Sequence, residues 1–200
     1  QLLAVHSFQG RPHVGALKHF GFKQGKGELL VELDHDDLLA PEALQALVRE
    51  ARSSHQPGFF YSDCAVFKPD GSSHTYGQDW GWPEPYSAEL MGSRYQVQRS
   101  FAPTARSLCE IYYAPNHVRA WRRSIYHALG GHDANLALGD DHDLLCRTYL
   151  SGVPFVHIPQ PLYLQRYHLD STSLSRVPDR GRIRGRRCTG ARPSTAYRRD

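Results

Sequence analysis

The sequence predicts one α/β domain, in which helices flank a largely parallel or mixed β-sheet. Short apolar runs of strand length cover residues 28–33, 58–63 and 153–158, and the first two end on aspartates. Segments with helical spacing of apolar residues lie between these runs. Strands that alternate with helices are typical of α/β folds. The 200 residues, 40% of them hydrophobic, are enough for one buried core.

The N-terminal part predicts a helix, a strand, an acidic loop and a second helix. Residues 1–27 are rich in Gly, His and Lys and predict a loop with one short helix over 14–22. The strand 28–33 stops at the acidic turn 34–37, and Pro41 stands where the next helix would begin. Four apolar residues follow at helical spacing, which predicts the helix: Leu44, Leu47, Val48 and Ala51.

The middle of the chain predicts a strand, a hairpin and a long loop. Residues 58–63 form the second apolar run and end on Asp63, and a polar turn follows at 69–71. Residues 77–107 contain Trp80 and Trp82 but no clear periodicity, which predicts a long functional loop. The two tryptophans suit either a platform for stacking a sugar ring or an ordinary buried anchor.

The C-terminal part predicts two helices and a strand. A short helix over 124–129 should stop at Gly130 and Gly131, which serve either as a helix stop or as a bend that lets a substrate approach. A second helix should begin at the acidic run 140–143. Its apolar positions are Leu144, Leu145, Tyr149 and Leu150. The strand 153–158 completes the domain, which we expect to span residues 1–175.

Charge is distributed unevenly along the chain. Residues 176–200 contain nine arginines and two aspartates, about +7, whereas the formal net charge of the whole chain is +4. The rest of the chain therefore carries about −3. A segment rich in Arg, Gly, Pro and Ser buries too little apolar surface to fold, so we expect a disordered basic tail.

Cysteine spacing and the lack of long apolar runs restrict the class of protein. The cysteines lie far apart and form no C-x-x-C pair, so we expect reduced thiols rather than a zinc ribbon or a disulfide framework. They are Cys64, Cys109, Cys146 and Cys188. No segment has the pattern of a signal peptide or a transmembrane helix, which predicts a soluble protein.

The strongest chemical pattern is Asp34-x-Asp36-Asp37 after the first strand. Carboxylates on alternate residues of a tight turn suit Mg²⁺ or Mn²⁺, and such ions complete their coordination with substrate phosphates. The same tetrapeptide also suits a solvated turn that caps a helix.

Two further patterns suggest binding or catalysis. Asp140-Asp141-x-Asp143 suits a general base at a helix start, or simple capping. Arg166 is suited to clamping phosphate oxygens, and His168 to binding a metal or phosphate, although such residues are more often a surface pair.

Taken together, these segments resemble a family-2 glycosyltransferase of the GT-A fold. The resemblance runs from about Gly10 to Thr172 and rests on the order and spacing of its motifs. The matching segments are GKGELLVELDHDDLLAPEALQALV, YSDCAVF, YYAPNHVRAWRRSIYHALGGHD, LGDDHDLLCRTYLSG and PLYLQRYHLDSTS. The resemblance implies a Rossmann-like mixed sheet that binds a nucleotide-diphosphate sugar.

The resemblance also implies roles for individual residues. Asp36 would bind the metal, while Asp34 would lie near the donor ribose or the metal with Asp37 in support. Asp141 would be the catalytic base, and Asp140 would help to shape the helix start. The remaining implied residues are Gly130, Gly131 and His132 beside the donor sugar and acceptor, and Arg166 and His168 at the diphosphate and metal.

The implied reaction transfers a sugar to an acceptor hydroxyl with inversion, assisted by Mg²⁺ or Mn²⁺. The acceptor would be a glycan, a lipid-linked or another hydroxyl, as in polysaccharide or cell-surface glycan synthesis. This implies a cytoplasmic location, with peripheral association at the inner face of a membrane as an option. The family's first strands and their Pro-x-Tyr/Phe-Asn segment have no counterpart before Gln1. The resemblance therefore implies an N-terminally truncated fragment.

Two other classes of function stay open. Twelve histidines and several aspartates suit a metal-dependent phosphoester hydrolase, although the H-x-H and H-E-x-x-H spacings are missing. The basic tail suits a non-catalytic module that binds nucleic acid through phosphates. The body of the chain shows no nucleic-acid motif, so we expect no specific nucleic-acid partner.

Overall fold

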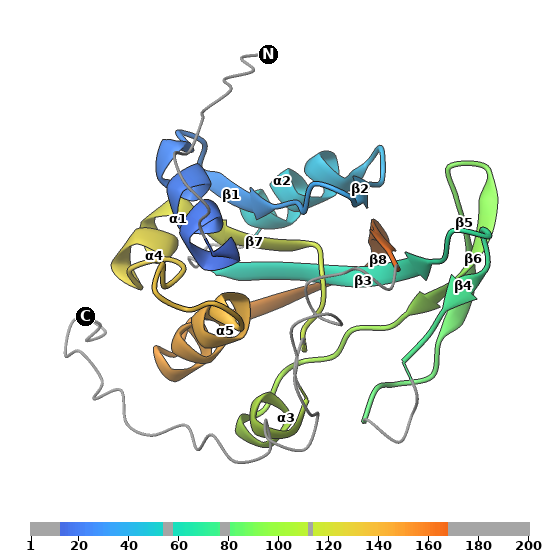
Figure 1. Ribbon diagram of the computed structural model, residues 1–200. Helices are drawn as coiled ribbons and strands as arrows, with labels where there is room; N and C mark the ends of the chain where they lie inside the picture. The colour runs from blue at the N-terminus through green and yellow to red at the C-terminus, as the bar shows by residue number, and fades with distance from the viewer. Residues whose placement is uncertain (1–12, 54–57, 77–80, 112–113, 168–200) are drawn as a thin grey trace.

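A mixed β-sheet forms the centre of the protein, with helices on both sides (Figure 1). The computed structural model describes residues 13–53, 58–76, 81–111 and 114–167. The strands are β1 (Leu29–Glu32), β2 (Leu38–Leu39), β3 (Phe59–Phe67), β4 (Ser73–His74), β5 (Tyr86–Leu90), β6 (Ser93–Gln98), β7 (Arg119–Arg122) and β8 (Phe155–Arg166). The helices are α1 (Val14–Gln24), α2 (Ala43–Ser53), α3 (Ala105–Glu110), α4 (Arg123–Ala128) and α5 (Asp140–Leu150).

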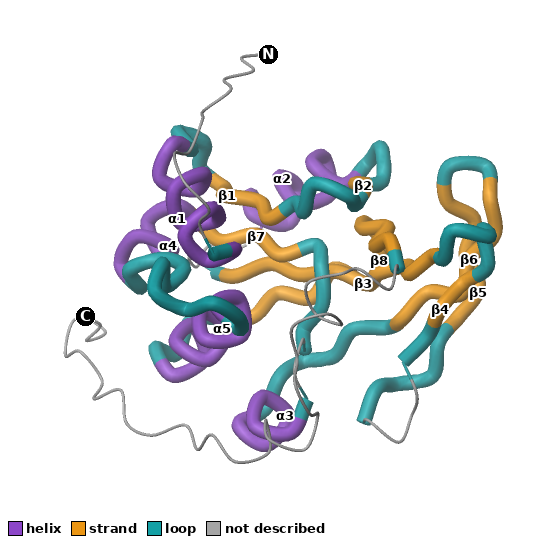
Figure 2. The backbone as a smooth tube through the Cα atoms, viewed as in Figure 1, coloured by secondary structure: helices purple, strands orange, loops and turns teal. Residues whose placement is uncertain are grey.

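The long strand β3 organises the sheet (Figure 2). It pairs in parallel with β8 and antiparallel with β7, β6 and β4. β1 joins the sheet through β7, and the short β2 pairs with the end of β8. The prediction of an α/β domain with a mixed sheet is therefore confirmed.

The core has a layer on each face of the sheet. On one face, α2 packs its alanines and Leu47 against Phe60 and Val118. On the other face, α4 and α5 pack against Phe59 and Trp121. Successive side chains of a strand point to opposite faces, and both faces of this sheet are covered. β3 is therefore buried along nearly its whole length.

Several predicted elements are confirmed with small changes of boundary. α1 begins at Val14, as its pattern predicts, and α5 begins at Asp140. α4 ends before Gly130 and Gly131, which have φ angles of 81° and 69°. Side chains other than glycine rarely adopt this left-handed conformation, so the pair stops the helix.

The helix predicted after Pro41 is confirmed as α2, but only two of its four spaced apolar residues are buried. Leu47 and Ala51 are buried, but Leu44 and Val48 are 55% and 42% exposed. The helix instead buries the small residues Ala43 and Ala46, because α2 lies close to the sheet. Apolar spacing alone does not distinguish these two sets of positions.

The pattern predicts that the second strand ends at Asp63, but β3 continues to Phe67. Asp63 is fully buried within β3. Its carboxylate accepts hydrogen bonds from Tyr86 Oη at 2.8 Å and Ser100 N at 2.7 Å, and pairs with His157 Nε2 at 2.8 Å. Because these partners satisfy the carboxylate, the strand accommodates it in its interior.

The prediction of a long loop over 77–107 is wrong for most of its described residues. β5 and β6 form an antiparallel hairpin there, with Tyr86 opposite Val97. The turn lies at Met91 and Gly92, whose φ angles are 52° and 79°. One face of the hairpin is exposed and charged, so its strands lack the apolar content that marks the buried ones.

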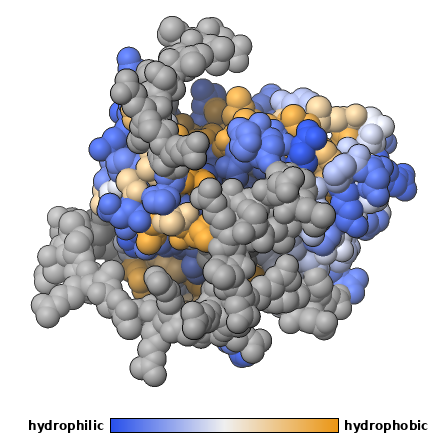
Figure 3. Space-filling view, viewed as in Figure 1, coloured by the Kyte–Doolittle hydropathy of each residue, from blue (hydrophilic) through white to orange (hydrophobic). Residues whose placement is uncertain are grey.

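The surface mixes hydrophilic areas with smaller hydrophobic ones, as the face in Figure 3 shows. Large exposed apolar side chains are scattered over several elements and include Leu17, Leu33, Met91 and Leu150. Within the described ranges, every helix is too short or too polar to cross a membrane. The predicted basic tail, Trp80, His168 and Cys188 lie outside the described residues.

Candidate functional site

The acidic turn after β1 is held against the end of β8. Tyr163 Oη accepts a hydrogen bond from Asp34 N at 3.1 Å and donates one to Asp37 Oδ2 at 2.8 Å. Arg166 N donates to Asp37 Oδ1 at 2.7 Å, and Arg166 Nε donates to Asp36 O at 3.1 Å. The pairing of β2 with β8 brings these residues together from distant parts of the chain.

The three aspartates of this turn are not equivalent. Asp37 has both carboxylate oxygens bonded within the protein, and burial raises its pKa to about 6 despite the bonds from Arg166 and Tyr163. The side chains of Asp34 and Asp36 are 35% and 27% exposed, so both carboxylates reach solvent. Asp37 thus braces the turn, while Asp34 and Asp36 present oxygens outward.

Two partly exposed carboxylates on alternate residues fit a divalent cation that keeps several waters and takes further ligands from a phosphate. Within the described residues, no group of three or more His, Cys, Asp or Glu side chains is placed to hold a metal ion by itself. The structure places the Arg166 guanidinium at the same turn, 5.2 Å from the centre of the Phe67 ring.

Asp141 lies in the first turn of α5 and is tied to β7. Its Oδ2 accepts a hydrogen bond from Arg119 Nη1 at 2.7 Å, and its Oδ1 accepts one from His142 N at 2.8 Å. Burial alone would raise the pKa of Asp141, but the nearby Arg119 and Lys18 outweigh burial and lower it to about 2. Asp141 is therefore an anion at neutral pH, and its side chain is 13% exposed.

Arg119, the partner of Asp141, also pairs with Glu32 on the neighbouring strand β1. They are opposite each other in the β1–β7 pairing, and Arg119 Nη1 lies 3.7 Å from Glu32 Oε2. The side chains of Arg119 and Glu32 are 0% and 2% exposed. Although burial opposes ionisation of both, Lys18 and then Arg119 hold the pKa of Glu32 well below its usual range, and Asp141 and then Glu32 hold the pKa of Arg119 above its usual value.

Lys18 of α1 completes a chain of charges between the two acidic motifs. Its ammonium donates a hydrogen bond to Glu32 Oε1 and lies 3.2 Å from Asp34 Oδ1. The chain runs from Asp34 through Lys18, Glu32 and Arg119 to Asp141. The structure thus brings the acidic turn and the start of α5 into one network, as a shared site requires.

Sequence reasoning missed Lys18, Glu32 and Arg119. One signal was available, since Glu32 interrupts the apolar strand β1 at a buried position. A carboxylate at such a position needs a buried cation. The sequence does not identify that cation, because the pairing of β1 with β7 was not predicted.

Asp140 and His132 form a second buried pair. His132 Nε2 lies 4.0 Å from Asp140 Oδ2, and within the described residues neither atom has a hydrogen-bond partner. Tyr126 Oη accepts a hydrogen bond from His132 N and lies 2.9 Å from His132 Nδ1. These two contacts hold the imidazole ring beside Asp140.

Burial has opposite effects on the pKa values of these two residues. It lowers the pKa of His132 to about 4 and raises the pKa of Asp140 to about 6, where Asp141 adds to the effect. His132 is therefore neutral at pH 7. Asp140 does not cap α5 with its side chain, because Gly139 is the N-cap residue and no side-chain cap bond forms.

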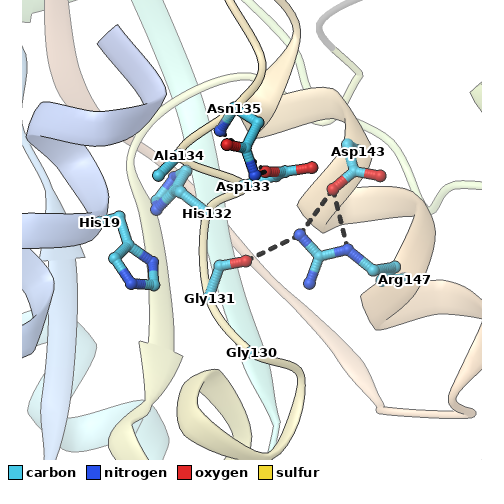
Figure 4. A pocket seen from close by; sticks show the side chains of 9 residues that line it. All are labelled: His19, Gly130, Gly131, His132, Asp133, Ala134, Asn135, Asp143 and Arg147. Carbon is cyan, nitrogen blue, oxygen red and sulfur yellow. Dashed lines mark hydrogen bonds and ion pairs between the residues drawn. The ribbon is translucent and has the colours of Figure 1, made fainter. Parts of the chain in front are cut away.

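A polar cavity of about 470 Å³ lies beside this pair (Figure 4). Arg147 forms one wall and donates hydrogen bonds to Asp143 Oδ2 and to the carbonyls of Leu129 and Gly131. The other lining residues are His19, Gly130, His132, Asp133, Ala134 and Asn135. The sequence-predicted residues Gly130, Gly131 and His132 thus line one cavity.

A second, more apolar cavity of about 680 Å³ lies between α1 and β1. Phe22, Leu30 and Leu33 contribute apolar surface, while Lys18 and Asp34 lie at its lining. Both volumes fall within the usual range for sites that bind small molecules. Trp82 lines neither cavity; it is buried with Phe101 and Ile111, as an anchor would be.

Comparisons with protein-family models and with curated proteins found no match to this chain.

Proposed function

We propose that this protein is a glycosyltransferase of the GT-A fold, which transfers a sugar from a nucleotide-diphosphate donor to an acceptor hydroxyl with inversion. The observation that supports this most is the chain of ion pairs that links Asp34 to Asp141. It joins a turn suited to metal and phosphate with a carboxylate suited to proton transfer. The motif resemblance and the mixed α/β sheet support the same proposal.

On the donor side, Asp36 and Asp34 would hold Mg²⁺ or Mn²⁺ against the diphosphate. The bound ion would supply electrostatic stabilisation of the departing nucleoside diphosphate. Tyr163 and Arg166 hold the backbone and Asp37 of the same turn, which fixes the direction of its two outward carboxylates. The cavity between α1 and β1 opens at Asp34 and has the apolar surface and the volume for a nucleoside.

On the acceptor side, Asp141 would take the proton of the attacking hydroxyl. Arg119 keeps this carboxylate ionised and fixed in position, and its low pKa of about 2 makes it a weak base. The resemblance puts the acceptor at Gly130, Gly131 and His132, which line the polar cavity, whereas Asp141 is not among the residues that line it.

The test is a transfer assay with purified protein, Mn²⁺ and a panel of nucleotide-diphosphate sugars. The release of nucleoside diphosphate is measured. Asp36→Asn should remove metal-dependent donor binding measured by calorimetry. Asp141→Asn should keep donor binding and lower turnover by about 10²–10⁴-fold. Glu42→Gln, which removes an exposed carboxylate before α2, is the control and should keep wild-type activity.

Two outcomes would contradict the proposal. Donor affinity that is unchanged in Asp36→Asn would count against the metal assignment. Water-dependent phosphoester cleavage that persists in Asp141→Asn, without sugar transfer, would favour the hydrolase instead.

A further inference from the structure

Lys18, on α1, contacts the acidic turn at Asp34. Its ammonium contacts two carboxylates at once, Glu32 and Asp34, and the Asp34 contact is 3.2 Å long. The Lys18 side chain is 14% exposed. Burial alone would lower the pKa of Lys18, but Glu32, Asp34 and Asp141 together raise it above its ordinary value, so the ammonium stays charged.

We infer that Lys18 is a built-in counterion of Asp34 and competes with a divalent cation for that carboxylate. When Lys18 Nζ is paired with Asp34 Oδ1, that oxygen does not also bind an ion. Binding of an ion through Asp34 Oδ1 requires the Lys18–Asp34 contact to open. This inference rests on the proposed role of Asp34 and Asp36 as metal ligands.

The two contacts of Lys18 differ in how easily they break. The Glu32 side chain is 2% exposed and has no solvent to replace its partner, whereas the Asp34 side chain is 35% exposed. Losing the contact with Asp34 therefore costs less than losing the contact with Glu32. Lys18 stays anchored to Glu32 while its contact with Asp34 opens.

The helix that carries Lys18 has little room to shift toward α5. A Cβ atom added at Gly15, one turn earlier, would lie 2.8 Å from Asp140 Cβ and 2.6 Å from Asp133 O. α1 is thus packed tightly at its first turn. The ammonium must leave Asp34 by rotation of the Lys18 side chain rather than by movement of the helix toward α5.

The test uses Mn²⁺ alone, whose binding to the full chain is measured by electron paramagnetic resonance. Lys18→Met would leave Glu32 buried with one partner fewer, so the variant is the double substitution Lys18→Met with Glu32→Gln. Compared with Glu32→Gln alone, the double variant lacks only the ammonium, a like charge a few ångströms from the ion, and should bind Mn²⁺ about tenfold more tightly. Adding Asp34→Asn should cancel that gain. Lys26→Met, at an exposed lysine before β1, should leave the affinity unchanged.

A second measurement uses the wild-type protein, in case the double variant does not fold. Titration with Mg²⁺ should shift the side-chain NMR signals of Lys18, and those of Lys26 should stay in place. Unchanged Lys18 signals at saturating Mg²⁺ would overturn the inference. So would Mn²⁺ affinity in the folded double variant that is equal to or weaker than that of Glu32→Gln, or no saturable Mn²⁺ binding in either.

These results are separable from those of the transfer assay. Failure of sugar transfer with every donor, together with tighter Mn²⁺ binding in the double variant, would leave the competition intact and remove the glycosyltransferase proposal. Sugar transfer that needs Asp36, together with unchanged Mn²⁺ affinity in the double variant, would support the glycosyltransferase proposal and remove the competition.

Discussion

Arg119 and Asp141 form a buried ion pair in which Nη1 and Oδ2 are 2.7 Å apart, and it fixes the first turn of α5 to β7. Arg119 also faces Glu32 and donates from Nε to the carbonyl of Pro115 at 3.0 Å. One guanidinium thus compensates two buried carboxylates. Its loss would leave Asp141 without its main partner and Glu32 with one cation fewer beside Lys18, and this leads to the first prediction.

Arg119→Met should lower the free energy of unfolding by about 3–5 kcal/mol, because removing one member of a buried ion pair leaves an uncompensated charge. Urea denaturation at pH 7 measures the change. Adding Asp141→Asn should recover part of the loss. The control is Arg106→Met, since Arg106 pairs with Glu110 on the surface of α3 and is 84% exposed. That substitution should cost at most about 0.5 kcal/mol. Equal losses in both variants would contradict the prediction.

Asp140→Asn should become more stable than wild type as the pH rises. The pKa of Asp140 is about 6 in the folded protein, above its ordinary value of 3.8. The contribution of the Asp140 carboxyl group to stability is therefore present in full below about pH 4 and is lost as the pH rises through 6. Lys18 opposes this loss, whereas Asp141 and Glu32 add to it. Asparagine does not ionise, so it avoids the loss.

The stability difference between Asp140→Asn and wild type should grow by about 2–3 kcal/mol between pH 4 and pH 8. Urea denaturation at each pH measures this difference, and Glu42→Gln controls for the loss of a carboxylate. A difference that stays constant across the pH range would show that Asp140 does not ionise in a buried position.

Gly15→Ala and Gly21→Ala should change stability in opposite directions, although both lie in α1. A Cβ at position 15 would collide with Asp133 O and Asp140 Cβ, whereas at position 21 nothing lies within 4 Å. Gly15→Ala should cost about 1–3 kcal/mol through overpacking. Gly21→Ala should gain about 0.5–1 kcal/mol, because alanine favours the helix. Thermal unfolding of the two variants checks this, and a gain in both would contradict the close approach of α1 to α5.

Gly131→Ala should be more destabilising than Gly130→Ala. Both glycines have positive φ, so each substitution strains the backbone. Only at position 131 would the added Cβ also lie 2.6 Å from atoms of the Tyr126 ring. Since Tyr126 is buried and bonded to His132, the ring cannot shift freely. Gly131→Ala should cost about 1–3 kcal/mol more than Gly130→Ala in chemical denaturation. Equal effects would show that Tyr126 adjusts without cost.

The sequence predicted the parts of the fold that local patterns encode. The strand before Asp34 and the helix stop at Gly130 follow from short stretches of apolar and glycine residues, and the structure confirms both. The β5–β6 hairpin was not predicted, because its exposed face removes the apolar signal of a buried strand. The burial of Asp63 within β3 was not predicted either, because its three partners come from distant segments.

The candidate site shows the same division. The sequence by itself determined an α/β domain with two acidic motifs, one after an apolar strand and one at a helix start. The tertiary structure decided that Asp34 and Asp141 are joined through Lys18, Glu32 and Arg119. It also decided that Asp37 braces the turn while Asp34 and Asp36 face solvent. The physical reason is that a charge is compensated by its neighbours in space, and strand pairing rather than sequence distance sets those neighbours.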